Sequence, residues 1–303
     1  MIVSASYRTD IPAFYADWFA RRLEAGWASY RNPYSGRTHR LRLDPKAAEG
    51  FVFWTRNLRS FFPVLERLEA ERRPFVVQFT LTGYPGALER ATLRPEAALN
   101  QLELLAARFG PRVGVWRYDP VFLADPTPPD FHRRQVEALA RRLRSVVDEV
   151  VFSFAQVYAK TARNTDRAAA RHGFAWRDPN DEEKRALLGE LAGIAAAEGL
   201  VPTLCSQPDL LSAPLVAARC IDAARLSDIA DVFGGKAVAA RLKGNRPGCL
   251  CAESRDIGAY DSCPHGCVYC YAVRDRAVAL ARQRDHDPGS PGIVPEAGEK
   301  AEG

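Results

Sequence analysis

The sequence predicts an α/β protein whose parallel sheet is either open or curved into a TIM-like (β/α) barrel, complete or incomplete. Apolar, β-rich runs alternate with amphipathic helical segments through most of the 303 residues. This alternation is typical of right-handed βα units. In addition, nearly every strand-like run ends in polar residues or cysteine, and barrel sites are built at those carboxyl ends. Fold and candidate site therefore point to the same edge of the sheet.

The predicted strands are short runs rich in β-branched and aromatic residues. They cover residues 2–6, 51–55, 75–81, 113–118, 149–155 and 200–205. Amphipathic patterns predict helices between them, at 11–25, 57–71, 94–108, 129–146 and 182–198. From 206 to 248 the pattern changes to short helices, with no nucleotide-binding fingerprint.

The chain is expected to form one domain over residues 1–284, in which 206–270 is a cysteine-rich, cluster-binding part. A helix rich in alanine and arginine is predicted at 272–284. The Pro/Gly-rich segment 285–303 is predicted to be a disordered tail.

Composition narrows the class of protein. The 47% hydrophobic and 26% charged content is that of an ordinary globular protein. No apolar run approaches the ~20 residues of a membrane helix, and the N-terminus does not read as a secretory signal. We therefore expect no membrane partner and a cytoplasmic location, where thiols stay reduced. The net charge of +5 permits an anionic partner such as nucleic acid but does not indicate one.

Three cysteines carry the sharpest motif. Cys263, Cys267 and Cys270 are spaced C-x3-C-x2-C within DSCPHGCVYCYA. Three thiolates on a tight loop bind three irons of a [4Fe-4S] cluster and leave the fourth open, which is how radical S-adenosylmethionine (SAM) enzymes hold their cluster. A zinc knuckle that includes His265 is the alternative. Disulfides are disfavoured because seven cysteines are an odd number and no signal peptide is present.

The other four cysteines supply a second set of thiolates: Cys205, Cys220, Cys249 and Cys251. Four thiolates are the complement of a second, fully ligated cluster. The alternative is that Cys205 and Cys220 are small buried hydrophobic residues. We expect the four to converge on one site, because Cys205 ends a strand at the rim to which the C-x-C segment must return.

Polar residues at the strand ends are candidate substrate contacts. Arg56 follows the second predicted strand, and Arg117 and Asp119 end the fourth. Gln78 lies within the third. We assign catalytic or substrate-binding roles to these side chains, with structural ion pairs as the alternative.

The segment DSCPHGCVYCYA resembles the cluster loop of radical SAM proteins related to spore photoproduct lyase, with their C-x-HGC-x-YCYA pattern. SYRTDIP, FVFWTRN and FVVQFTLTGYP followed by a glutamate resemble the strand ends that follow the loop in that family. Here the loop comes last, so the chain resembles a circular permutation with the cluster-bearing βα unit moved to the C-terminus. It is also similar to an uncharacterised bacterial family with a C-terminal cluster loop.

The resemblance implies site roles. Cys263, Cys267 and Cys270 would bind the SAM cluster, and Tyr269 would occupy the aromatic position near the adenine of SAM. Asp10, Thr55 and Asn57 would be rim residues near SAM. The chain departs from the family in its order, in its four additional cysteines and in lacking a clear Gly-Gly-Glu segment, so photoproduct repair is not carried over.

The leading hypothesis is a radical SAM-like enzyme with one catalytic and one auxiliary [4Fe-4S] cluster, reduced by a donor such as flavodoxin or ferredoxin, acting on an unknown substrate. The alternative is a nucleic-acid-binding protein stabilised by zinc or iron-sulfur, without SAM turnover. A metal-independent barrel hydrolase lacks a recognisable nucleophile motif or histidine pair. The permutation predicts that residues 2–6 lie beside 257–260 and that Asp10 and Cys267 share one rim.

Overall fold

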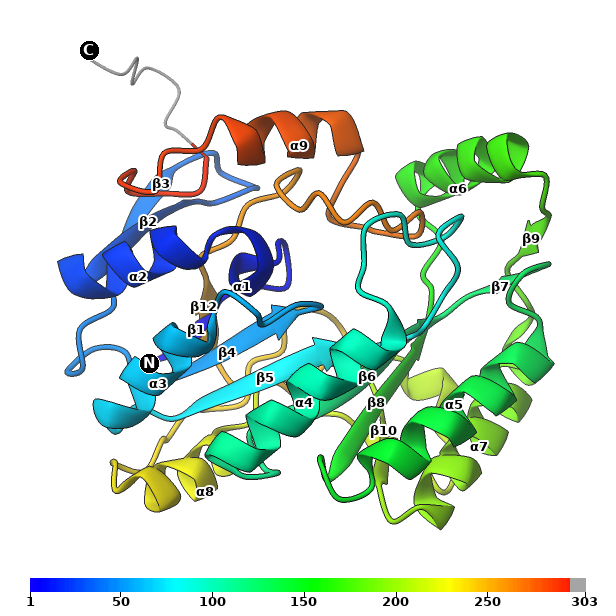
Figure 1. The fold of residues 1–303 in the computed structure, drawn as a ribbon, viewed down its shortest axis with the longest axis horizontal. Coiled ribbons are helices and arrows are strands. Elements are labelled where there is room, and N and C mark those ends of the chain that lie inside the picture. Colours follow the sequence, from blue (N-terminus) through cyan, green and yellow to red (C-terminus); the bar gives the residue numbers. More distant parts are fainter. Residues whose placement is uncertain (295–303) are drawn as a thin grey trace.

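The computed structural model describes residues 1–294 and has a parallel sheet at its centre (Figure 1). Its eight strands are ordered β11 (Val216–Ala217), β10 (Val201–Leu204), β8 (Glu149–Phe154), β6 (Gly114–Val121), β5 (Phe75–Thr80), β4 (Gly50–Thr55), β1 (Ile2–Ser4) and β12 (Ser254–Asp256). Every pair in this sheet is parallel. The carboxyl ends of all eight strands therefore lie at one edge, called here the carboxyl rim.

The strands follow one another across the sheet in chain order, except that β12 lies beside β1. This is the order of a βα barrel. Between the two edge strands, however, the described residues show no β11–β12 ladder. A backbone hydrogen bond of 2.9 Å, from the N–H of Ala252 to the carbonyl of Ile221, joins the segments near them. The structure thus shows a mixed α/β fold with a large parallel sheet, and strand pairing does not establish a closed barrel.

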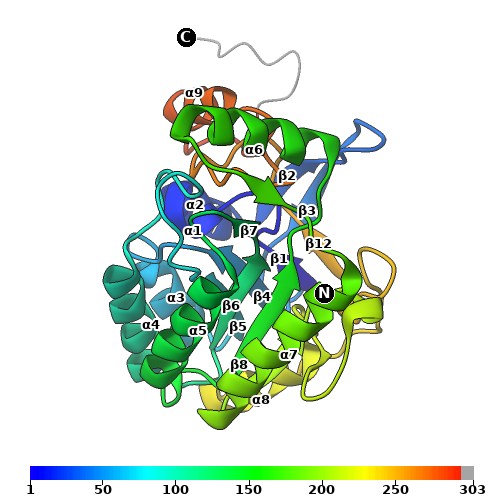
Figure 2. The same ribbon diagram turned by 90° about the vertical axis from the view of Figure 1, so that its right-hand side faces the viewer.

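Helices cover the sheet and its ends (Figures 1 and 2). They are α1 (Ile11–Phe14), α2 (Ala16–Ala25), α3 (Phe62–Ala70), α4 (Pro95–Phe109), α5 (Pro129–Leu143), α6 (Ala159–His172), α7 (Asp181–Ala197), α8 (Ala223–Phe233), α9 (Arg276–Arg284) and the 3-10 turn η1 (Pro208–Leu210). Two short antiparallel ribbons add β2 (Trp27–Arg31) with β3 (Thr38–Arg42), and β7 (Leu123–Ala124) with β9 (Trp176–Arg177).

Alternate residues of the strands face the helices and form part of the hydrophobic core. Phe51 and Phe53 lie on one face of β4, and their rings pack edge-on against Phe19 of α2 with centroids 5.9 and 5.4 Å apart. At the opposite end of the sheet from the rim, Phe233 of α8 packs against Phe75, the first residue of β5. Full burial of such a ring contributes about 1.5–3 kcal/mol.

The predicted strands agree with six of the eight, and the predicted helices agree apart from their ends. The helix predicted at 11–25 is divided at Tyr15 into α1 and α2. The pattern missed β12, because the three residues Ser254–Asp256 are all polar. It also missed α6, which buries only Thr161 and Thr165 and therefore has no apolar stripe.

The expected adjacency of the chain ends is confirmed. β1 pairs with β12 in parallel register, Ile2 opposite Ser254 and Ser4 opposite Asp256. The N–H of Ile257 continues the pairing to the carbonyl of Ser4 at 3.0 Å. The pairing is with residues just before the expected 257–260, and it is fixed by the buried Asp256 carboxylate, which accepts from the hydroxyls of Ser4 and Ser6 at 2.6 and 2.8 Å.

The prediction of a disordered tail from residue 285 is wrong for residues 285–294. Trp18 donates its indole N–H to the carbonyl of Ser290 at 2.9 Å, and Ile293 is buried. These contacts supply the burial that the Pro/Gly-rich composition does not reveal. Residues 295–303 lie outside the described residues. No helix in the described part of the chain is long and apolar enough to span a membrane.

Candidate functional site

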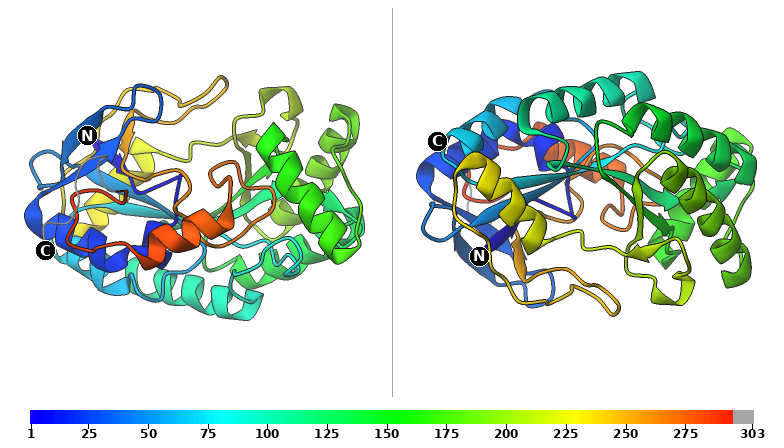
Figure 3. Two further views of the ribbon diagram at one scale, coloured as in Figure 1. Left: turned by 90° about the horizontal axis from the view of Figure 1, so that it is seen from above. Right: turned by 90° about the horizontal axis from the view of Figure 1, so that it is seen from below.

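The three-cysteine loop lies over the carboxyl rim, across the connection between β5 and α4 (Figures 1 and 3). Two backbone hydrogen bonds fasten it there. The N–H of Val268 donates to the carbonyl of Leu88 at 3.0 Å, and the N–H of Ala91 donates to the carbonyl of His265 at 2.9 Å. The loop is thereby held against the connection between β5 and α4.

The turn within this loop depends on Gly266. Its φ of +77° lies in the left-handed region, which favours glycine. A Cβ at this position would also come within 2.5 Å of Cδ of Arg276. On the far side of the turn, the N–H of Ala272 points at Sγ of Cys270 at 3.3 Å. Local backbone geometry therefore arranges the three thiols on one short segment.

Burial raises the pKa of all three loop thiols, and raises that of Cys267 to about 12. Neighbouring thiols and Asp10 raise the pKa values of Cys263 and Cys267 further. At neutral pH the free side chains are thus uncharged thiols. A bound metal would have to displace their protons.

Asp10 ties this loop to two strand ends. Its carboxylate accepts the hydroxyl of Thr55 at 2.7 Å and the backbone N–H of Arg56 at 2.8 Å, and it lies 2.7 Å from Nε2 of His265. It also caps α1 through the N–H of Ala13. The expectation that Asp10 and the cysteine loop share one rim is confirmed.

Both ring nitrogens of His265 lie within hydrogen-bond distance of an oxygen. Nδ1 lies 3.0 Å from the carbonyl of Ala91, and Nε2 faces Asp10. Both neighbours are oxygen acceptors, so neither nitrogen is turned toward the cysteines as a metal ligand. The loop therefore offers three sulfur donors, and the zinc knuckle with His265 as fourth ligand does not fit this arrangement.

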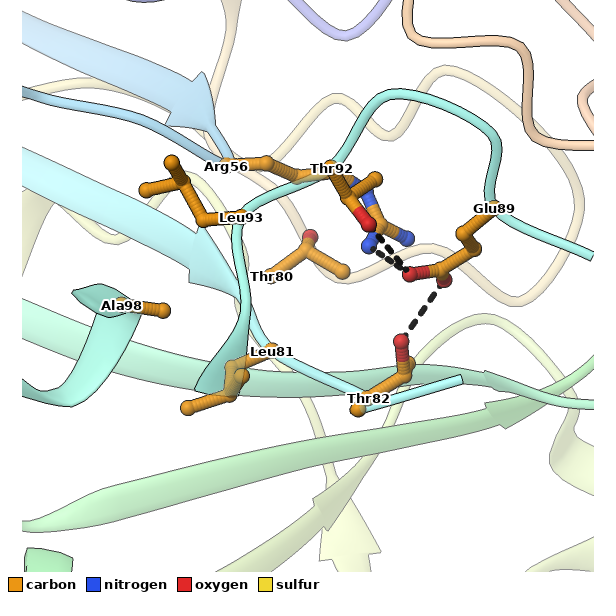
Figure 4. A pocket seen from close by; sticks show the side chains of 9 residues that line it. Arg56, Thr80, Leu81, Thr82, Glu89, Thr92, Leu93 and Ala98 are labelled. Atoms are coloured by element: carbon orange, nitrogen blue, oxygen red, sulfur yellow. Dashed lines mark hydrogen bonds and ion pairs between the residues drawn. The ribbon is translucent and has the colours of Figure 1, made fainter. Parts of the chain in front are cut away.

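Arg56, Glu89 and Tyr269 form a buried polar network beside the loop. Figure 4 shows Arg56 and Thr82 directed at the Glu89 carboxylate. Nη1 of Arg56 lies 2.9 Å from Oε2 of Glu89, whose side chain is 2% exposed. The hydroxyl of Tyr269 donates to Glu89 and accepts from Nη2 of Arg56 at 3.0 Å. Thr82 donates to the same carboxylate at 2.7 Å. Arg56, predicted as catalytic, has a structural ion-pair partner here.

Tyr269 is enclosed rather than open to a ligand. Its ring packs against Tyr84 and Phe122, with centroids 6.0 and 5.7 Å apart. The cavity next to Arg56 and Glu89 has a volume of about 10 Å³, the size of a single water. Asn57 is engaged as well, since its side-chain oxygen accepts from Nε2 of Gln101 at 2.9 Å. These side chains brace the rim.

The four upstream cysteines are brought together from three segments, after β10, after β11 and before β12. Sγ of Cys220 lies 3.5 Å from Sγ of Cys205, and the thiol of Cys251 interacts with those of both Cys220 and Cys249. The expected convergence of Cys205, Cys220, Cys249 and Cys251 is confirmed. Cys205 and Cys220 are both buried in the hydrophobic core, so the alternative that they are small buried hydrophobic residues stays open.

Two guanidinium groups face these sulfurs. Nη1 of Arg117 lies 3.1 Å from Sγ of Cys220, and Nη2 of Arg246 lies 3.5 Å from Sγ of Cys205. Arg117 also pairs with Asp119, which accepts from Ser153. Gln78 donates to the carbonyl of Cys220 at 2.9 Å. The predicted substrate contacts Arg117, Asp119 and Gln78 thus surround the four-cysteine site.

The thiols of this site differ in acidity. The hydrogen bond from Cys251 lowers the pKa of Cys249 to about 5, whereas the pKa values of Cys220 and Cys251 are raised to about 11. Within residues 1–294, no three or more His, Cys, Asp or Glu side chains form a ready-made site for a single metal ion. This holds for the three loop cysteines and for the four upstream cysteines alike.

Sequence reasoning missed three contributors to the site. Glu89 centres the network under the loop, and its only signal was the glutamate that follows TLTGYP. Arg246 reaches Cys205 from a stretch of the chain with no clear pattern. Burial and the nearby Cys270 raise the pKa of Tyr271 while Arg246 lowers it, so this side chain is within electrostatic range of residues from both sets of cysteines.

The chain belongs to the family described as a domain of unknown function (DUF1848), whose model matches residues 2–272. The matched range includes all seven cysteines. It gives no evidence for a relationship to radical SAM proteins or to spore photoproduct lyase. A comparison with curated proteins found no match.

Proposed function

We propose that the protein is a radical SAM-like enzyme that holds one [4Fe-4S] cluster on Cys263, Cys267 and Cys270. The observation that carries the proposal is a set of three thiols on one loop at the carboxyl rim, with His265 turned away to Asp10 and Ala91. Such a donor set leaves one iron free for the amino and carboxylate groups of SAM. When bound, the cluster supplies the electron that cleaves SAM into a radical able to abstract hydrogen from a substrate.

The placement of the loop supports the proposal. β12 leads into the loop and pairs with β1, the adjacency that a circularly permuted relative of the spore photoproduct lyase group requires. The succession of parallel strands supports an incomplete βα barrel. Asp10, Thr55 and Arg56 then serve to hold the loop in position over the rim, and Tyr269 anchors it through Glu89.

The four-cysteine site fits an auxiliary cluster. Four sulfur donors and no histidine are a complete ligand set for a [4Fe-4S] cluster. Four thiolates carry negative charge, and Arg117 and Arg246 already point N–H groups at Cys220 and Cys205. We propose that these two arginines balance that negative charge and do not contact the substrate.

The substrate surface in this proposal lies between the two sites. Tyr271 is 40% exposed, and its hydroxyl donates to the carbonyl of Tyr7 at 2.5 Å. The ring of Tyr7 packs edge-on against Trp54, with centroids 6.0 Å apart. These aromatic side chains offer a partly apolar surface that excludes water from a bound substrate.

A nucleic-acid-binding protein stabilised by zinc or iron-sulfur is the second candidate, because four thiolates are also a complete zinc ligand set. Anaerobic purification followed by iron, sulfide and zinc analysis separates the two. The enzyme predicts about eight irons per chain after reconstitution. Stoichiometric zinc with little iron would favour the alternative.

A second measurement tests the chemistry itself. Dithionite-reduced protein is mixed with SAM, and the products are separated by chromatography. The proposal expects 5′-deoxyadenosine and methionine. Protein that holds both clusters but forms neither product would contradict the catalytic role.

A further inference from the structure

A basic cleft lies beside the three-cysteine loop, between α6 and the start of α9. It has a volume of about 170 Å³ and is lined by Lys160, Arg163, Asn164, Arg167, Arg274 and Asp275. Four of these side chains are cationic and one is acidic. Figures 1 and 3 show α6 and α9 on the same side of the molecule, above the rim.

The cations come mainly from one face of α6. Lys160, Arg163 and Arg167 follow at spacings of three and four residues, which places them along one stripe of the helix. At 1.5 Å per residue this row is about 10 Å long. α6 buries only Thr161 and Thr165, so packing against the core does not account for the basic side chains along this stripe.

Within the described part of the chain, these cations are not paired with carboxylates. Among residues 1–294, none of Lys160, Arg163, Arg167 and Arg274 forms an ion pair with a carboxylate. Asp275, the acid in the cleft, is occupied as the N-cap of α9, where it accepts the N–H of Ala277 at 2.8 Å. Like charges at this spacing repel one another, and an anion between them relieves the repulsion.

The cleft is joined to the cysteine loop. Nδ2 of Asn164 donates to the carbonyl of Val273 at 3.4 Å. Nζ of Lys160 lies 5.4 Å from the ring centre of Tyr260, three residues before Cys263. A group bound in the cleft would thus be held beside the loop.

We propose that this cleft binds the phosphate groups of a phosphorylated ligand. Arginine donates paired N–H groups that match phosphate oxygens, and three of the four cations are arginine. Clefts that enclose a whole small molecule have about 300–1,000 Å³, so this smaller one takes the phosphate part. The row of about 10 Å is long enough for more than one phosphate. The inference is independent of cluster chemistry, since it requires neither SAM nor iron.

The test measures binding to the full-length protein as purified, with inorganic pyrophosphate, adenosine diphosphate and a short single-stranded oligonucleotide as three separate probes. Arg167→Gln is compared with Arg171→Gln, which removes the same charge from α6 at a position outside the cleft. We expect Arg167→Gln to weaken binding about tenfold. Arg171→Gln should change it by less than about twofold, as for a solvent-exposed charge.

The three probes identify the source of the phosphate. Binding of pyrophosphate and adenosine diphosphate, both sensitive to Arg167→Gln, supports a nucleotide-like ligand. Sensitivity with the oligonucleotide alone, with a salt slope lowered by about one, supports a nucleic-acid backbone. Absence of binding by all three at low salt, or equal losses in the two variants, would overturn the proposal. Because no readout uses SAM, these outcomes are separate from failure of the proposed enzyme activity.

Discussion

The two cysteine sites are built in opposite ways at one rim. The three-cysteine loop is local: eight residues of chain carry its sulfurs, and Gly266 sets its turn. The four-cysteine site is assembled from three separate segments, and Cys205 lies 46 residues before Cys251. The first site is fixed by backbone hydrogen bonds and a buried Arg56–Glu89 pair, whereas cations face the sulfurs of the second. A local site is therefore specified by spacing, and a dispersed one by the fold.

The largest expected effect comes from removing one thiol at each site. Cys267→Ala should lose the SAM-reactive cluster, about half of the iron and all SAM cleavage, because the loop holds no spare thiolate. Cys251→Ala should lose the other half of the iron. Iron and sulfide analysis with the SAM cleavage assay measures both. A Cys251→Ala protein that retains all its iron would contradict a cluster at the four-cysteine site. A Cys267→Ala protein that still cleaves SAM would contradict the role assigned to the loop.

Replacing the buried arginine at each site should lower the unfolding free energy by different amounts. Arg56→Met leaves Glu89, 2% exposed, without its cation, and should cost about 3–5 kcal/mol of unfolding free energy. Arg117→Met leaves Asp119, which is 22% exposed and keeps its hydrogen bond from Ser153, and should cost about 1–3 kcal/mol. Anaerobic urea denaturation measures the difference. Equal losses would mean that the two ion pairs brace the rim alike.

Glycine substitutions test the sites while leaving every thiol in place. Gly266→Ala forces a side chain into a backbone with φ of +77°, at a cost of about 1–2 kcal/mol, and should weaken cluster retention in the three-cysteine loop. Gly244→Ala would bring Cβ into steric overlap with the carbonyl oxygen of Cys249 and should disturb the four-cysteine site. Iron content and SAM cleavage distinguish the two. Loss of SAM cleavage in Gly244→Ala alone would contradict the separation of roles.

The smallest effect concerns oxidation of the metal-free protein. Sγ atoms of Cys205 and Cys220 are 3.5 Å apart and must approach to about 2.05 Å to form a disulfide. We expect mild oxidant to link this pair before any loop cysteine. Peptide mass mapping detects the bond, and Cys263→Ser serves as a control that should leave it unchanged. A first disulfide within 263–270 would show that the loop thiols are closer in solution than those of the dispersed site.

Much of the fold could be predicted because its signals are local. The runs at 51–55, 75–81 and 149–155 match β4, β5 and β8 to within one residue at each end, since buried parallel strands need continuous apolar residues. The polar β12 and the Thr-packed α6 carry no such signal. Both depend on partners distant in sequence, namely Ser4 and Ser6 for β12 and the loop around Val273 for α6.

By itself the sequence determined the strand and helix succession and the sulfur spacing of residues 263–270, because both are properties of neighbours along the chain. Only the tertiary structure decided that the Asp10 carboxylate lies against Nε2 of His265 and that Glu89 forms an ion pair with Arg56. It also decided that Arg117 and Arg246 face the sulfurs of the four-cysteine site. It also decided that the basic stripe of α6 borders the cysteine loop. Hydrogen bonds and ion pairs act over a few ångströms through space, and distances of that kind are set by how parallel strands and their helices pack.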